Sequence, residues 1–132
     1  MTVPHAFAGL EYLNTAVMLL DREHRVGYVN PAAEDLFEFS NRHVRGLFLH
    51  QIFAAADSLL SALEHALTSG AGFAEHALSL AQPGRERVPV SLFVTTIEAG
   101  PVRLVLEFHP VEQQMKIARE ERMLLQQQAN QE

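Results

Sequence analysis

The sequence predicts an α+β fold in which a five-stranded antiparallel sheet carries helices on one face and is flanked by a helix at each end. Two observations lead to this prediction. Apolar residues recur at helical spacing in several short segments, and beyond Gly70 the pattern changes to the looser alternation of strands. Turn residues divide the segments, chiefly at Asn30-Pro31, Pro83-Gly84 and Gly100-Pro101. One sheet with its helices on one face accommodates this order of elements.

The first predicted elements are a helix and a β-hairpin. Phe7 and Leu10 stand at a spacing that places both on one face of a helix. The apolar run Ala16–Leu20 and the segment Val26–Val29 predict two antiparallel strands. Because the connection between these strands has no glycine, we expect His24 or a neighbour to take a positive φ, which histidine tolerates better than most residues.

Helix signals follow the hairpin. Asn30 before Pro31 predicts an N-cap and a first helical residue, because the asparagine side chain accepts hydrogen bonds from free backbone N–H groups and proline fits the first turn. Short helical pieces are expected between residues 41 and 54. Asp57 is the predicted cap of a longer helix over residues 58–69, whose leucines gather on one side.

The rest of the chain predicts a meander and an exit helix. Strands are expected over residues 73–81, 88–97 and 102–108. From Val111 onward glycine and proline are absent, and apolar residues recur at heptad-like spacings of four and three. Since an isolated helix of this length is marginal in water, we expect it to pair with a partner helix.

These elements predict three parts: an N-terminal helix over residues 1–14, a central domain over 15–110 and a coiled-coil-like exit helix over 111–132. The 132 residues are 48% hydrophobic and 20% charged, which suits one globular domain and argues against a disordered chain. The net charge of −6 comes without a basic patch, so no nucleic-acid partner is expected.

The composition also limits the chemistry and the location. The sequence has no cysteine, which removes disulfides, thiolate metal sites and cysteine nucleophiles and suits a reducing cytosol. The most apolar stretch, Ala16–Leu20, is far shorter than the roughly 20 residues that span a bilayer. We therefore expect a cytoplasmic protein that has no membrane partner.

Two segments carry a resemblance to a known family. The first runs from Leu19 to Leu36 and resembles the first hairpin and capped helix of PAS domains. The second runs from Leu106 to Glu120, with the glutamine-rich stretch beyond it, and is similar to the last strand and exit helix of the NtrB (GlnL) family of nitrogen-regulation sensor histidine kinases. PAS domains often end the last strand with an Asp-x-Thr motif. Here Glu112 supplies the acid and the threonine is missing.

The resemblance implies a PAS fold and a sensory, dimeric module that passes a signal through the exit helix to a downstream kinase domain in the same chain. It also implies the PII signalling protein and the response regulator NtrC as partners. The sequence contains no kinase signature, so we expect no catalytic residue in this fragment. The helical pattern still runs at Glu132, and we expect the gene to continue into a phospho-accepting histidine box and an ATP-binding domain.

Two sets of side chains are candidates for function. Aromatic and apolar residues of the predicted core are candidates for a small-molecule pocket, although they equally fit a plain core: Phe37, Phe53, Leu63 and Phe93. Residues of the flanking helices are candidates for dimerisation and signalling: Phe7, Leu10, Glu112, Met115 and Leu125. His65 falls on the polar side of its helix, and no histidine pair has convincing metal-ligand spacing, so we expect no metal, no cofactor and a colourless protein.

Two alternatives remain open at this point. One is a ligand-sensing PAS domain of a transcriptional activator or another signalling protein. The other is a small α+β isomerase or hydrolase, which would need a buried acid or histidine in its pocket.

Overall fold

The structure is a computed structural model that describes residues 5–130, with side chains described at all of these positions except 5–6, 112–118 and 128–130. Its elements follow the predicted order. They are η1 (His5–Tyr12), β1 (Ala16–Leu20), β2 (Val26–Val29), α1 (Pro31–Phe37), α2 (Asn41–Val44), α3 (Leu49–Ile52), α4 (Asp57–Ser69), β3 (Phe73–Leu80), β4 (Val88–Ala99), β5 (Val102–Pro110) and α5 (Val111–Asn130).

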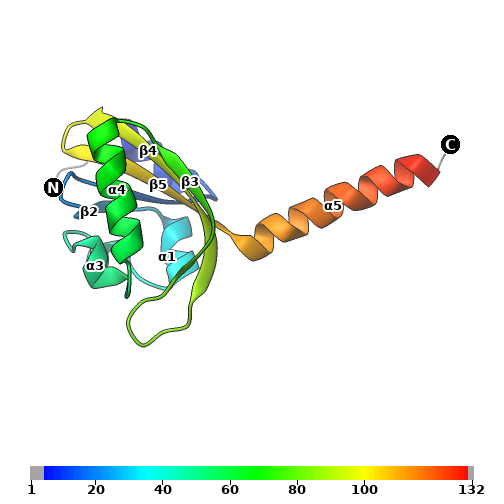
Figure 1. The fold of residues 1–132 in the computed structure, drawn as a ribbon, viewed down its shortest axis with the longest axis horizontal. Coiled ribbons are helices and arrows are strands. Elements are labelled where there is room, and N and C mark those ends of the chain that lie inside the picture. The colour runs from blue at the N-terminus through cyan, green and yellow to red at the C-terminus, as the bar shows by residue number, and fades with distance from the viewer. Residues whose placement is uncertain (1–4, 131–132) are drawn as a thin grey trace.

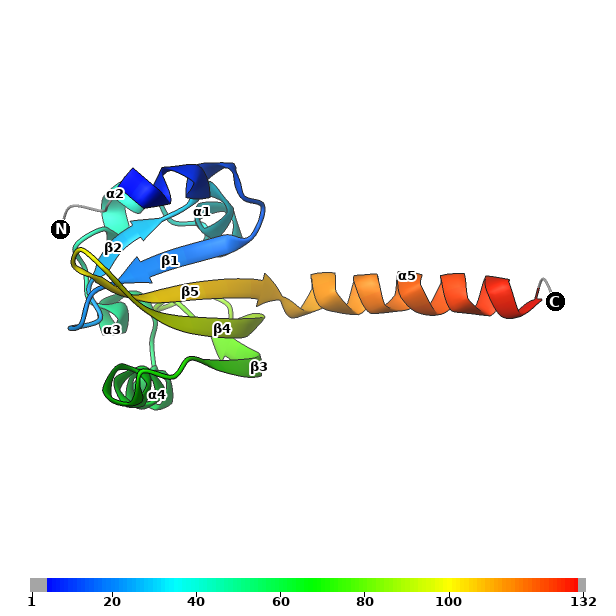
Figure 2. The same cartoon turned by 90° about the horizontal axis from the view of Figure 1, so that it is seen from above.

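One five-stranded sheet organises these elements. Its strands lie in the order β2-β1-β5-β4-β3, and each neighbouring pair is antiparallel. Helices α1–α4 pack against one face, the 3-10 helix η1 lies against the other face, and α5 extends away from the domain (Figure 1, Figure 2). The predicted α+β architecture is confirmed.

Strand β1 is buried on both faces, which explains its unbroken apolar sequence. Met18 and Leu20 belong to the main core between the sheet and the helices, whereas Val17 and Leu19 form a second apolar cluster with Val102. Successive side chains of a strand point to opposite faces, so a strand that is covered on both sides has no exposed position for a polar residue.

The turn between β1 and β2 confirms the positive φ at His24, which is 67°. The Asp21 carboxylate organises this turn by accepting hydrogen bonds from the backbone N–H groups of Glu23 and Arg25, at 3.0 and 2.8 Å. His24 Nε2 lies 3.1 Å from Glu64 Oε2 of α4. The turn therefore sits directly against the longest helix of the domain core.

The cap predicted for α4 is wrong. The N-cap position belongs to Ala56, no side chain caps the helix, and Asp57 is the first helical residue. Ala56 is only 7% exposed, so burial in the core, and not a polar cap, fixes the start of this helix. Asp57 contributes instead through its negative charge in the first turn, where the helix dipole favours it.

A bulge in β3 explains why apolar and polar residues alternate only loosely in its sequence. The pairing with β4 changes register between Glu75 and Leu78, and Ala77 within that interval has a φ of 59°. A bulge of this kind leaves one residue unpaired and bends the strand. Because β3 is an edge strand, the irregularity also makes that edge a poorer template for pairing with another chain.

Gly72, just before β3, tests how closely the backbone approaches β4, because a Cβ atom at that position would overlap the backbone carbonyl of Val94. Replacing Gly72→Ala should lower the free energy of unfolding by about 2–3 kcal/mol, the usual cost of overpacking against a rigid neighbour. Gly9→Ala is the matched control, since a Cβ there meets no atom within 4 Å. Urea denaturation measures both variants, and equal stability of the two would contradict the close approach of β4.

Candidate functional site

The junction between β5 and α5 is the first candidate site. Strand β5 pairs with β1 on one side and β4 on the other, and α5 begins at Val111, directly after the last strand residue Pro110. The helix has 20 residues, a length of roughly 30 Å at the rise of an α-helix. Figure 2 shows it leaving the sheet in line with β5. The helix therefore begins where the central strand of the sheet ends.

The described part of α5 carries apolar side chains that this chain leaves uncovered. Met123, Leu124 and Leu125 are 62%, 61% and 66% exposed. Leu125 is the one that falls on the heptad-like pattern predicted from the sequence. The predicted signalling residues Glu112 and Met115 lie outside the described side chains. These three consecutive side chains point in different directions around the helix, and Leu125 is the one that a seam with a second helix would cover.

The opposite end of the chain contacts the sheet. Phe7 and Leu10 of η1, two of the predicted dimerisation residues, are half-buried against the cluster of Val17, Leu19 and Val102, so the sheet already covers part of each side chain. The exposed apolar residues of this segment lie just beyond, with Tyr12 83% and Leu13 48% exposed.

Tyr28 is a half-buried member of the same outer cluster. Burial, followed by the nearby carboxylates of Glu11 and Glu34, raises the pKa of its phenol above the ordinary value of 10.0. The phenol therefore stays protonated at neutral pH.

The structure brings three of the four predicted pocket residues together. The ring of Phe37 lies 5.1 Å from that of Phe53 and 5.1 Å from that of Phe108, both edge-on. Leu63 is fully buried in the same core. These contacts are typical of a well-packed aromatic cluster. Phe93 lies elsewhere, because its neighbours on β4 point into the core and its own ring points to the outer face of the sheet.

On that outer face Phe93 lies between two histidines. Its ring is edge-on to His109 at 5.1 Å and to His76 at 5.9 Å. His109 Nε2 is 3.8 Å from Glu107 Oε2. The group lies beside the start of α5, since His109 is next but one to Val111. Period-two alternation, applied strictly to β4, would have predicted the outward direction of Phe93.

Asn30 has a larger role than the cap that the sequence predicted. Its Oδ1 accepts hydrogen bonds from the backbone N–H of Ala33, as an N-cap does, and also from that of Val17, at 3.0 and 2.9 Å. Its Nδ2 donates to the carbonyls of Leu10 and Thr15, at 3.1 and 2.8 Å. The side chain is completely buried. One amide therefore holds η1, β1 and α1 together.

No metal site emerges from the part of the chain that the structure describes, where no cluster of three or more potential ligands occurs. His65 is exposed on α4, as predicted. Among the described helices, none has both the length and the apolar character needed to cross a membrane.

The family comparison agrees with this architecture. Residues 10–114 match the family model described as the PAS fold, and the chain belongs to that family. The PAS domain of nitrogen regulation protein NR(II) from Vibrio parahaemolyticus is similar in structure, with a TM-score of 0.66, 24% identity and coverage of 83% of this chain and 100% of that one. The RpfR quorum-sensing receptor PAS domain of Cronobacter turicensis, solved with BDSF, has a TM-score of 0.64 at 14% identity, over 75% of this chain and 95% of that one.

The curated relatives point to one kind of signalling protein. The chain is 28% identical over 120 residues to the sensory histidine kinase/phosphatase NtrB of Klebsiella oxytoca, and 30% identical over 123 residues to that of Vibrio alginolyticus. Each match covers 91% of this chain and 34% of the relative, so the chain spans about a third of the length of these proteins. The resemblance to the PAS domain of NtrB is thereby confirmed.

The role of Asn30 leads to a prediction about stability. Asn30→Ala should lower the free energy of unfolding by roughly 3–5 kcal/mol, because it leaves several buried backbone groups without a partner. Asn30→Asp should also destabilise the fold, because it buries a carboxylate and sets one of its oxygens against the carbonyl oxygens of Leu10 and Thr15. Exposed Asn14→Ala is the control and should change stability by less than about 0.5 kcal/mol. Urea denaturation would contradict the assignment if Asn30→Ala behaved like the control.

Proposed function

We propose that this chain is the sensory and dimerisation module of an NtrB-like histidine kinase of nitrogen regulation. The module relays its signal through α5 to a kinase core in the same protein. It carries no catalytic residue, and the histidine kinase and phosphatase activities belong to the full-length protein. By resemblance the partners are the PII signalling protein and the response regulator NtrC, and the location is the cytoplasm. The similarity to NtrB over 91% of this chain supports the proposal.

The observation that carries the proposal is the direct passage of the central strand into an exposed helix. Strand β5 has hydrogen-bonded neighbours on both sides, so it responds to changes on either half of the sheet. Because α5 follows Pro110 without a turn, rotation or sliding of β5 becomes rotation or sliding of the helix. Small shifts of this kind bias a helical bundle between two discrete packings.

Dimerisation follows from the surface of α5. Two copies of the chain related by two-fold symmetry would bury the Leu125 side chains against each other. Arg122, three residues earlier, occupies the preceding position of the seam. The contact is small on its own, and the arginine weakens it. A weak pairing is useful in a relay, because the signal has only a small free-energy difference to overcome.

A chimera tests the relay. This chain, substituted for the PAS region of Klebsiella oxytoca NtrB, should yield a kinase that phosphorylates NtrC. Leu125→Glu should reduce phosphoryl transfer about tenfold, equivalent to ~1.4 kcal/mol, because it places a carboxylate in the helix seam. Leu124→Glu is the matched control, since this leucine is similarly exposed but lies outside the seam, and it should change the rate less than about twofold.

The rate of phosphate transfer from labelled ATP to NtrC measures both variants. Equal losses in the two would show that the seam does not pass through Leu125. A chimera as active as the kinase core alone, and insensitive to both substitutions, would remove the relay function from this domain.

A further inference from the structure

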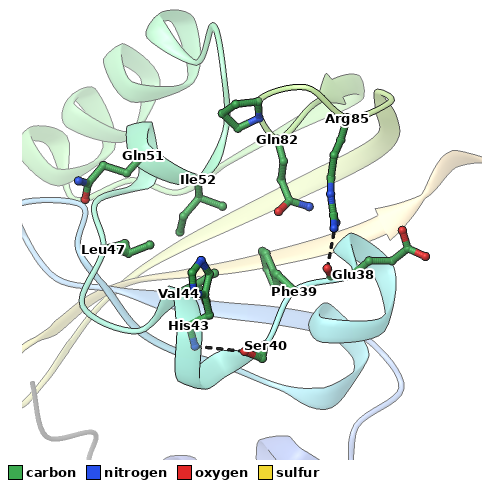
Figure 3. A pocket seen from close by; sticks show the side chains of 11 residues that line it. Glu38, Phe39, Ser40, His43, Val44, Leu47, Gln51, Ile52, Gln82 and Arg85 are labelled. Carbon is green, nitrogen blue, oxygen red and sulfur yellow. Dashed lines mark hydrogen bonds between the residues drawn. The ribbon is translucent and has the colours of Figure 1, made fainter.

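A surface cleft lies outside the features described above. It opens between helices α1–α3 and the loop that joins β3 to β4, and it has a volume of about 460 Å³ (Figure 3). Pockets that bind small organic molecules usually measure about 300–1,000 Å³. Its apolar lining comes from Phe39, Val44, Leu47 and Ile52. The cleft therefore has both the size and a suitable floor for a ligand with an apolar body.

Polar groups converge on one side of this cleft. Gln82 and Arg85 reach in from the β3–β4 loop, and His43 comes from α2. Figure 3 shows the amide of Gln82 and the ring of His43 directed into the hollow, while the Glu38 carboxylate points away from it. Because Gln82 Nε2 donates to the carbonyl of Phe37, the side chains that can still donate to a molecule in this space are those of Arg85 and His43.

The rim of the cleft carries the guanidinium of Arg85 as well as the carboxylate of Glu38. Arg85 Nη1 donates to the carbonyl oxygens of Glu38 and Phe37, at 2.9 and 3.3 Å, which holds the guanidinium in place at the end of α1. A guanidinium carries five N–H donors in a fixed plane, and these two bonds use only one of its nitrogens. The remaining edge is suited to a carboxylate, which arginine binds in a bidentate manner.

The cleft borders the aromatic core at Phe39, whose ring lies 5.4 Å from that of Phe37. Phe37 itself is 3% exposed, packs against Phe53 and Phe108, and does not line the cleft. A molecule can therefore enter the cleft without opening the cluster of rings. Once there it contacts α2, α3 and the β3–β4 loop together.

We propose that this cleft binds a small carboxylate with an apolar body, whose carboxylate meets Arg85 and whose body lies on Leu47 and Ile52. This goes beyond the relay function, because it assigns a ligand to a cleft that lies outside β5 and α5. Arg85 lies on the β3–β4 loop and His43 on α2, whereas the relay uses β5 and α5.

Cinnamate is the probe, and cinnamyl alcohol, which has the same body without the charge, is its counterpart. Amide chemical shifts of this chain should respond to cinnamate at Val44, Leu47 and Ile52. Arg85→Gln should weaken cinnamate binding about fivefold and leave cinnamyl alcohol unchanged, because it removes the charged partner. Arg87→Gln is the matched control, since it makes the same change on the same loop at an exposed residue outside the cleft lining.

A second pair of variants guards against a disturbed loop in Arg85→Gln. His43→Trp fills the hollow from α2 and should abolish the binding of both probes. Arg42→Trp, at the preceding exposed position of the same helix, should leave both bound. Neither Arg42 nor His43 takes part in the hydrogen bonds that Arg85 donates to the carbonyls of Phe37 and Glu38.

Any of the following results overturns the proposal. The first is equal affinity of the unchanged chain for cinnamate and for its alcohol. The second is a change of chemical shifts at core residues such as Leu63 and not at the cleft. The third is that neither probe binds at millimolar concentration. A loss of affinity in Arg87→Gln equal to that in Arg85→Gln would also reject it. None of these results bears on phosphoryl transfer by the chimera.

Discussion

The buried amide of Asn30 is the interaction on which the arrangement of the N-terminal half depends. It accepts from Val17 and Ala33 and donates to Leu10 and Thr15, so all of its bonds go to backbone groups of other segments. In a buried site each of these backbone groups would be costly to leave unpaired. No apolar side chain of similar size satisfies both donors and acceptors, which makes this position unusually restrictive.

The segments that the Asn30 amide holds together are linked to the exit helix α5 through two adjacent strands. Asn30 fixes β1 relative to η1 and α1, and β1 is the direct neighbour of β5 along its whole length, from Ala16 opposite Phe108 to Leu20 opposite Leu104. Strand β5 in turn continues into α5. The N-terminal segment and the C-terminal helix are therefore attached to adjacent strands of the sheet.

Much of this was predictable from the sequence, for local reasons. The first two strands were predicted at their observed bounds, because one is an unbroken apolar run and both are closed by turn residues. The Asn30-Pro31 cap and the positive φ at His24 depend on chain neighbours within a few residues. In each case the signal and its structural result lie in the same short segment.

The features that the sequence did not predict depend on residues distant along the chain. The bonds of Asn30 to Leu10 and Thr15 require the folded sheet. Arg85 meets the end of α1 at Glu38, a contact between residues 47 positions apart. Ala77 has a positive φ although it is not a glycine, so its residue type did not predict this conformation. The conformation belongs to the bulge in β3, which depends on the pairing of β3 with β4. Such contacts arise from tertiary geometry, which periodicity does not encode.

The central claim is that two copies of this chain pair through α5, along a seam that contains Leu125. Because the sequence has no cysteine, single cysteines placed at each position from 119 to 127 report this pairing without interference. Disulfide formation between copies, measured under mild oxidation, should peak at 122 and 125 and fall to a minimum at 123 and 124, as a heptad seam requires. Uniform cross-linking along the helix, or a maximum at 124, would contradict the account.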